Sequence, residues 1–453
     1  MNDVTVLILP EVRELLDRDD REGLRHALTE VHPADIADVI SNLDQPQAAV
    51  VFEALPEKRA VLTFEHLEET DQLRLLEAVG RGKMIRIIGE MSADDRADFM
   101  QSLPERTSES ILPLLAQAER NDVRKLVAYK EETAGAVMTT EYASLPADIT
   151  VGESLQRLRR IAPDSETIYY VYMTDAERRL LGYTTLRELV LARPDQNIME
   201  VQRQPLISAS VDTDQEEVAR VIQKYDFLAL PIVDAENRLV GIVTHDDVID
   251  VLEEEATEDV QRMGAVEPID IPYLRARFWQ LAWRRGGWLM LLFLEEMFTG
   301  TALRYYQTTL ERVVTLMFFV PLIISAGGNS GSQSATLVIR SLAVGDVKLR
   351  DWLRVFYREI GMGVALGVFL GAIGYIRALM WGNGPAVGLV VALSLVVIVT
   401  VGSIVGAMLP LLFKICRLDP GVASSPFVAS LVDVVGIVVY FNIARMLIPI
   451  PSP

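Results

Sequence analysis

Residues 327–336 read Gly-Gly-Asn-Ser-Gly-Ser-Gln-Ser-Ala-Thr and lie between two apolar stretches, 313–326 and 337–343. Lipid cannot hydrogen-bond an amide or a hydroxyl, so a polar segment at membrane depth must face other helices or a water-filled cavity. A second polar group, Asp433, lies in the apolar segment SLVDVVGIVVY, where a carboxylate costs about 3 kcal/mol on insertion scales. A hydrogen bond between helices, or an ion pair with an arginine at the membrane edge, would account for Asp433. We favour a ligand on an ion path.

A dense acidic run precedes the first long apolar segment. Eight carboxylates fall within residues 246–259. Four of them share one stripe of a helix, where like charges repel: Asp247, Asp250, Glu254 and Glu258. A solvated surface is the usual explanation for such a run. A divalent ion that joins this helix to another acidic surface would relieve the repulsion, and it would act directly before the membrane.

The charge of the chain is divided unevenly. Residues 1–270 contain 28 Lys and Arg against 55 Asp and Glu, whereas residues 271–453 contain 15 against 8. This acidity argues against a nucleic-acid partner and suits bound cations. Cys416 is the single cysteine, the four histidines show no metal-ligand spacing, and no nucleophile motif or phosphate loop is present. We therefore do not expect an enzyme.

The second half of the chain predicts a helical membrane domain. Five apolar stretches are each long enough to cross about 30 Å of hydrocarbon: 286–303, 313–339, 360–381, 386–413 and 421–448. Basic residues precede the first stretch and lie between the second and third and between the fourth and fifth, while the loop 382–385 has no charge. The positive-inside rule then places the N-terminus in the cytoplasm and the C-terminus outside.

The first half predicts two soluble modules. Residues 10–128 read as short helices with a weak repeat at an offset of 60, which favours an all-α superhelical solenoid. Residues 167–190 and 228–252 each read as strand, turn, strand and helix. This pattern is similar to the paired cystathionine-beta-synthase-type (CBS) domain, an α/β module that often senses nucleotides. That likeness implies that Thr244 and Asp247 face a bound ribose.

The order of these parts resembles the MgtE family of magnesium channels over essentially the whole chain. The motifs that carry the resemblance are PLIISAGGNSGSQSAT at 321–336, TDQEEVARVIQKY at 213–225, EATED at 255–259, GAMLP at 406–410 and Asp433. It implies five parts: an acidic helical domain at 1–130, two CBS domains at 131–200 and 201–255, a long connecting helix at 256–275, and a five-span transmembrane domain at 276–453.

The resemblance also implies a mechanism and its residues. A homodimer would conduct magnesium into the cell across the inner membrane, through a pore lined by Asp433, Ala429, Asn329, Ser332 and Ser425. Serine stands at 332 and 425, where the family usually has asparagine. Cytosolic magnesium would close the pore by bridging acidic residues: Asp94, Asp98, Glu216, Asp226, Asp247, Asp250, Glu255, Glu258, Asp259 and Asp419. ATP or another adenosine nucleotide would contact Tyr170, Arg187, Phe227 and Thr244.

A second hypothesis belongs to a different functional class. A secondary transporter could move a divalent cation against sodium or protons, because Glu295, Glu296 and Asp433 are membrane carboxylates that could carry protons. The positions of Glu295 and Glu296 stay open at this point, either near the outer surface or in a vestibule. Flux measured against an imposed sodium or proton gradient separates the two hypotheses.

Overall fold

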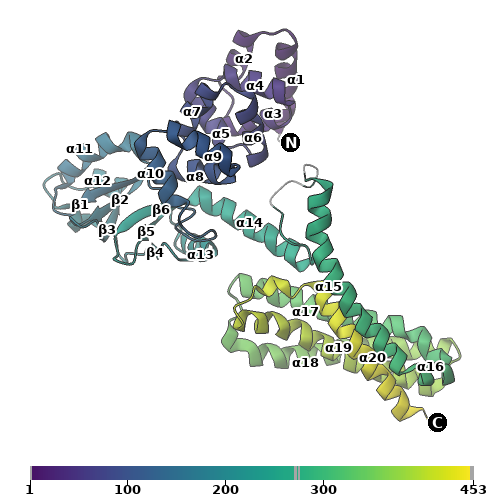
Figure 1. Cartoon of the computed structure of the whole chain (residues 1–453). Coiled ribbons are helices and arrows are strands. Elements are labelled where there is room, and N and C mark those ends of the chain that lie inside the picture. The colour runs from purple at the N-terminus through teal and green to yellow at the C-terminus, as the bar shows by residue number, and fades with distance from the viewer. Residues whose placement is uncertain (1–2, 270–272, 274–275, 449–453) are drawn as a thin grey trace. The chain divides into compact units, whose positions relative to one another are not determined.

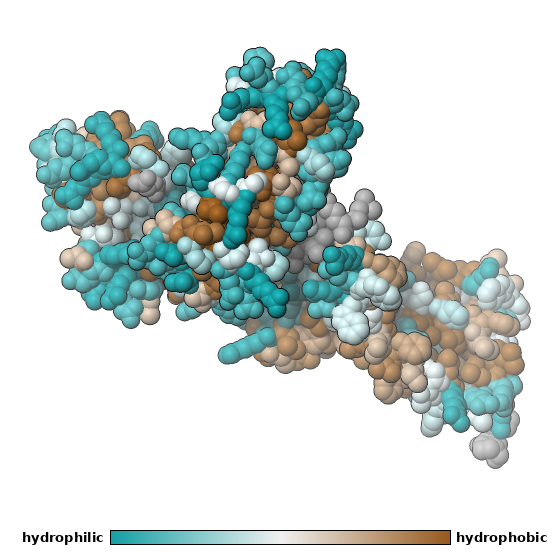
Figure 2. Space-filling model, turned by 45° about the horizontal axis from the view of Figure 1, so that its top comes forward, coloured by the Kyte–Doolittle hydropathy of each residue, from teal (hydrophilic) through white to brown (hydrophobic). Residues whose placement is uncertain are grey.

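The computed structural model describes residues 3–269, 273 and 276–448. They form two compact units, Met1–Leu252 and Glu253–Pro453. In the space-filling view the second unit carries most of the hydrophobic surface, while the first is largely hydrophilic (Figure 2). This difference follows from the uneven distribution of charged and apolar residues along the chain.

The first unit begins with a series of short helices (Figure 1). They are α1 (Asp3–Asp17), α2 (Arg21–Ala27), α3 (Pro33–Ser41), α4 (Gln45–Ala54), α5 (Glu57–Glu65), α6 (Glu69–Ala78), α7 (Arg81–Glu90), α8 (Ala93–Ser102), α9 (Glu105–Ile111), η1 (Leu112–Leu114) and α10 (Gln117–Leu126). From α1 to α7, each helix packs against the helix two places along the chain. The weak repeat has a structural basis, because the equivalent residues Leu43 and Leu103 are both buried in the core.

Two small sheets with one topology follow. The first contains β1 (Tyr142–Pro146), β2 (Thr167–Thr174) and β3 (Leu180–Thr185), with α11 (Val151–Ile161), η2 (Ala162–Asp164), α12 (Leu186–Leu191) and η3 (Ile198–Val201). The second contains β4 (Ala209–Ser210), β5 (Ala229–Val233) and β6 (Leu239–Thr244), with α13 (Gln215–Tyr225). In each sheet the first two strands are parallel and the last two antiparallel, with Tyr170 opposite Thr185 and Ala229 opposite Thr244.

The second unit is helical. After α14 (His245–Met263), which begins in the first unit, come α15 (Phe278–Tyr305), α16 (Gln307–Arg312), η4 (Val314–Phe319), α17 (Val320–Ala343), η5 (Leu349–Asp351), α18 (Trp352–Met380), α19 (Gly384–Ile415), η6 (Pro420–Val422) and α20 (Ser425–Leu447). The helix α19 packs against α17, α18 and α20, and α15 packs against α20. The buried core of the second unit includes Ile398 of α19 and Val432 of α20.

Four stretches within the described residues are long and apolar enough to cross a membrane: Val314–Ala343, Leu349–Met380, Gly384–Ile415 and Ser425–Leu447. The expected first span, 286–303, is helical and lies in α15. It falls outside this group because Glu295 and Glu296 interrupt its apolar sequence. The structure therefore supports a multi-pass arrangement, and the fifth span stays a prediction.

Of the connecting helix expected at 256–275, only residues 256–263 are helical among the described residues; they form the second half of α14, which runs from His245 to Met263, and residues 264–269 lie beyond its end. All four residues of the acidic stripe lie on this helix, which begins immediately after β6. The helix ends where Ala265 adopts a left-handed conformation (φ 56°) and the Val266 amide donates to the Gln261 carbonyl at 3.0 Å. Residues 270–272 and 274–275 of the expected helix lie outside the described residues.

Candidate ion path and regulatory sites

The polar decapeptide is part of one continuous helix, α17. Its glycines allow α17 to approach α19 closely. A Cβ atom built on Gly402 would lie 2.4 Å from the Gly327 carbonyl oxygen, and one built on Gly406 would lie 2.0 Å from the Gly331 carbonyl oxygen. Only hydrogen fits at such backbone contacts, so these glycines are required for packing of the two helices.

Two serines of the decapeptide are used between helices. Ser330 Oγ lies 2.7 Å from Ser403 Oγ and donates to the Val399 carbonyl at 3.2 Å. Ser334 Oγ donates to the Glu359 carboxylate on α18 at 2.7 Å. Both serines are buried. Part of the polarity of this segment therefore stabilises helix packing and does not face an aqueous path.

The opposite face of α17 is exposed and polar. Asn329 lies on this face, and its amide donates to Ser325 Oγ one turn earlier at 3.3 Å. Gln333 is exposed one turn later. In a membrane, such a face needs water or another subunit, because lipid offers no hydrogen-bond partner. It is the part of the decapeptide that remains available for an ion path.

Asp433 lies beside α17. A Cβ built on Gly328 would lie 3.2 Å from the Ala429 Cβ and 3.5 Å from Asp433 Oδ1, so α17 and α20 meet closely at the predicted carboxylate. Ser332 Oγ donates to the backbone carbonyl of Ser425 at 3.0 Å. The structure thus brings the predicted pore residues to one α17–α20 junction, with Asp433 half-buried and Asn329 exposed beside it.

Two further membrane carboxylates are close enough to act on Asp433. Glu295 and Glu296 of α15 both interact electrostatically with it. Glu295 also lines an open groove of about 470 Å³ together with Phe427 and apolar residues of α15. The sequence left open whether Glu295 and Glu296 lie near the outer surface or in a vestibule. The structure favours neither position, because the two glutamates lie near the predicted ion ligand itself.

In the first unit, Asp94 and Asp247 belong to one buried acidic region. Asp94 is 7% exposed, and its Oδ1 atom has no hydrogen-bond partner among the described residues. Burial raises the pKa of Asp247 to about 8, with the charge of Asp94 as the next cause. Burial likewise raises the pKa of Asp94. These two carboxylates repel each other, so a cation between them would stabilise both.

This region has other members that were not predicted from the sequence. Burial raises the pKa of Glu166 to about 8 and that of Glu141 to about 7, and Asp94 adds to both shifts. Burial is also the main cause that raises the pKa of Asp95 to about 7. Glu166 directly precedes β2, Glu141 directly precedes β1 and Asp95 lies on α8, so no spacing in the sequence connects them.

The other predicted regulatory residues have varied surroundings. Asp98 and Asp250 are exposed, Glu216 forms an ion pair with Arg220, and Asp226 ends α13 in a left-handed conformation. Glu255 and Asp259 are partly buried on α14. Among the described residues, no three acidic, histidine or cysteine side chains form a group that could hold a metal ion. A magnesium ion at these predicted residues would therefore need further ligands from water or from another surface.

Glu258 and Asp419 are joined by a protein cation. Arg262 Nη2 lies 2.6 Å from Glu258 Oε2, and Arg262 Nη1 lies 2.5 Å from Asp419 Oδ2. Both carboxylates were predicted to bind magnesium. In this structure they bind the same guanidinium.

The predicted nucleotide residues divide into two groups. Tyr170 and Phe227 belong to an aromatic cluster with Tyr183, in which the rings meet edge to face at 5.6–6.2 Å. Thr244 is buried, and its hydroxyl and amide bind Asp247 at the start of α14, as a helix cap does. Arg187 is exposed on α12.

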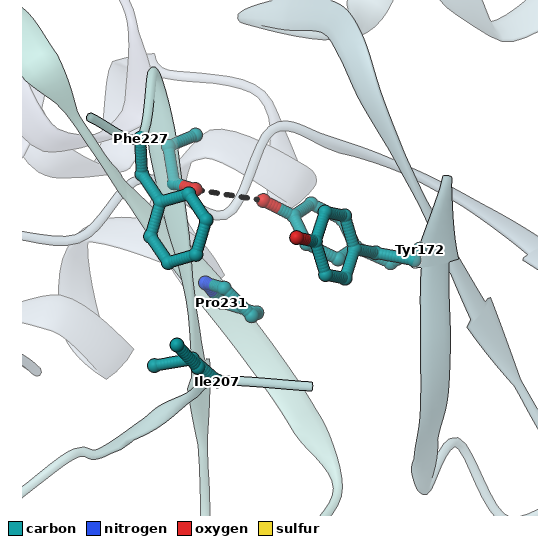
Figure 3. A pocket seen from close by; sticks show the side chains of 6 residues that line it. Tyr172, Ile207, Phe227 and Pro231 are labelled. Atoms are coloured by element: carbon teal, nitrogen blue, oxygen red, sulfur yellow. Dashed lines mark hydrogen bonds between the residues drawn. The ribbon is translucent and has the colours of Figure 1, made fainter. Parts of the chain in front are cut away.

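The cavity beside this cluster is small. It measures about 10 Å³ and is lined by residues of both sheets, among them Tyr172, Phe227 and Pro231 (Figure 3). The Tyr172 hydroxyl donates across it to the Ala229 carbonyl at 3.5 Å. This volume holds about one water molecule, so a nucleotide base would enter only after these side chains move.

Comparisons with known proteins agree along the chain. The MgtE family model, described as divalent cation transporter, matches residues 320–443; the MgtE intracellular N domain matches 31–132; and the CBS domain matches 198–254. The magnesium transporter MgtE of Thermus thermophilus is 41% identical over 96% of this chain and 98% of its own length. That of Bacillus subtilis is 33% identical over 91% and 94%.

Solved structures resemble about half of the chain. The cytosolic domain of the Mg2+ channel MgtE in complex with ATP is 39% identical, with a TM-score of 0.52, over 54% of this chain and 99% of that structure. The soluble part of a magnesium transporter is 32% identical, also with a TM-score of 0.52, over 56% of this chain and 99% of that structure.

Proposed function

Because this chain belongs to the MgtE family of divalent cation transporters, we propose that it is a magnesium channel of the inner membrane. The observation that carries the proposal is the junction of α17 and α20, where Asp433 lies against Gly328 and beside the exposed Asn329. Magnesium sheds its water reluctantly, so a carboxylate flanked by amide and hydroxyl groups suits an ion that keeps its water shell.

The pore is proposed to form between two copies of the chain, with five spans in each. The N-terminus is cytoplasmic and the C-terminus external. The exposed polar face of α17 supports the dimer, because a second copy and a water-filled path would satisfy Asn329 and Gln333. The helix α15 serves as the first span, with Glu295 and Glu296 directed to the protein interior or the path rather than to lipid.

Regulation is proposed to use the buried acidic region and α14. At high cytosolic magnesium, the ion bridges carboxylates such as Asp94 and Asp247, which otherwise repel each other. At low magnesium the repulsion separates the acidic surfaces and the pore opens. The raised pKa values support this proposal, because burial disfavours the charged form of both carboxylates and the charge of Asp94 adds to the shift of Asp247, so a bound cation would stabilise the charged forms.

Nucleotide binding is a further part of the proposal. A relative's cytosolic domain was solved with ATP. In this chain the aromatic cluster of Tyr170 and Phe227 offers faces for a base, once the side chains around the small cavity move. Titration calorimetry of ATP with wild type and Phe227→Ala tests this point: equal affinity of the two proteins would exclude Phe227 from the site.

The experiment that tests the function is a flux measurement on purified protein in liposomes. Magnesium uptake is recorded with a magnesium gradient alone, and again with sodium or proton gradients imposed in each direction. A channel predicts uptake that follows the magnesium electrochemical gradient only. Uphill magnesium movement at a fixed ratio to sodium or protons would instead establish the secondary transporter, for which the carboxylates Glu295, Glu296 and Asp433 provide candidate proton carriers.

A further inference from the structure

The last turn of α14 is held in one position. Its C-terminus is closed by the left-handed Ala265, and the Gln261 side chain accepts a hydrogen bond from the Ile269 amide at 2.7 Å. Met263 packs against the core of the helical membrane unit. Arg262 lies between these anchors, so its side chain extends from a stretch of backbone that is held in place.

Arg262 reaches the connection between α19 and α20. The stem of its side chain lies on Gly421, because a Cβ built on that glycine would lie 3.2 Å from the Arg262 Cβ. Asp419 Oδ2 accepts from the guanidinium at 2.5 Å, while Asp419 Oδ1 accepts from the Gly421 amide at 2.7 Å. Both oxygens of this carboxylate are thus occupied by protein donors.

The same guanidinium binds Glu258 one turn back on α14. The Arg262 side chain is 29% exposed, that of Glu258 20%, and that of Asp419 32%. Partial burial reduces screening by solvent, so this bridge is stronger than an ordinary surface ion pair. Arginine also stays charged at every physiological pH.

We infer that Arg262 is a tethered cation that competes with magnesium for Glu258 and Asp419 and holds the end of α14 to the α19–α20 connection when magnesium is absent. The inference rests on the proposed function. A magnesium ion can bind both carboxylates only after the guanidinium leaves them. Arg262 therefore sets how far the channel closes without the ion and how much additional closure the ion can produce.

The position of the bridge explains why it would affect the pore. Asp419 lies six residues before Ser425, the first residue of α20, and α20 carries Asp433. Ser425 itself accepts a hydrogen bond from Ser332 of α17 through its backbone carbonyl. A pull on the α19–α20 connection is thereby transmitted to the start of the helix that presents the predicted ion ligand.

The test is single-channel recording of the full-length protein in bilayers, with sodium as the permeant ion and no divalent ion, followed by magnesium titration on the cytosolic side. Arg262→Gln should raise the open probability without magnesium by about two- to fivefold, the upper part of the range expected for loss of one ion pair. It should also increase the difference in open probability between zero and saturating magnesium. Arg262→Lys, which can bind only one carboxylate well, should fall between Arg262→Gln and wild type.

Two controls separate this result from a general loss of charge or of function. Arg284→Gln removes an exposed ion pair of 3.2 Å with Glu267 in the same unit and should gate like wild type. In the Arg262→Gln, Asp419→Asn double variant, the second substitution should add little to the magnesium-free open probability. Wild-type gating in Arg262→Gln would overturn the inference while leaving magnesium conduction intact. Absence of magnesium current in every protein, wild type included, would instead refute the proposed function.

Discussion

Replacement of Gly406 by alanine tests whether the glycines of α17 and α19 position the ion path. The new Cβ would lie 2.0 Å from the Gly331 carbonyl oxygen, 2.7 Å from its carbonyl carbon and 2.9 Å from its Cα. All three atoms belong to the backbone, so no side-chain rotation relieves the contact. An ordinary contact of about 3.4 Å requires the two helices to separate locally by about 1.4 Å.

The separation has a calculable cost. Overpacking of this kind costs about 1–3 kcal/mol. The Ser330–Ser403 hydrogen bond, now 2.7 Å long, would exceed hydrogen-bonding distance after such a movement, at about 1 kcal/mol more. For a domain of this size, each kcal/mol lowers the melting temperature by roughly 2–4 °C. We therefore expect a decrease of about 4–16 °C in detergent, together with a loss of magnesium flux as α17 moves away from Asp433.

The measurement compares thermal unfolding and liposome flux of Gly406→Ala with those of Gly361→Ala. Gly361 lies on α18, where a built Cβ meets nothing within 4 Å, so this variant introduces the same methyl group at an unobstructed helical position. It should retain wild-type flux and melting temperature or gain slightly in stability. If Gly406→Ala behaves like Gly361→Ala, the proposed role of close α17–α19 packing is refuted.

Two further predictions concern the buried acidic region and α14. Because burial raises the folded-state pKa values of Glu166 and Asp247 to about 8, above their unfolded values, their stabilising contribution is complete below about pH 4 and is lost as the pH rises toward 8. In a soluble fragment of residues 1–263 with EDTA, the melting temperature should therefore rise between pH 8 and pH 6, and magnesium should stabilise more at pH 8; a Glu166→Gln, Asp247→Asn variant that keeps both effects would contradict this. Separately, Asp247→Asn, Asp250→Asn, Glu258→Gln should stay open at high cytosolic magnesium in patch recordings, and closure at the wild-type concentration would exclude ion bridging.

The order of the parts could be predicted because its signals are local. Apolar length, strand and turn patterns, and the repeat at an offset of 60 each report a structure formed by neighbouring residues, and the described helices and sheets follow that order. The residue at which the connecting helix ends was harder to predict from the sequence. It depends on Ala265 in a left-handed conformation, and alanine gives no sequence signal for such a turn.

The site was predictable only in part, for a physical reason. A polar residue in an apolar segment shows that it needs a partner, but not which face of its helix it occupies. Ser330 and Ser334 turned out to bind other helices, whereas Asn329 is exposed. Likewise, Glu141 and Glu166 join Asp94 only through tertiary packing, and Arg262 meets Asp419 across 157 residues of sequence.

The central claim is that Asp433 is the ion ligand of a magnesium pore. It is tested most directly by single-channel recording with magnesium as the only permeant cation, comparing wild type, Asp433→Ala and Ser430→Ala. Ser430 lies on the same helix, and its hydroxyl binds only the Pro426 carbonyl one turn back among the described contacts. The account predicts magnesium current in wild type and Ser430→Ala and its loss in Asp433→Ala. Unchanged magnesium current in Asp433→Ala would contradict it.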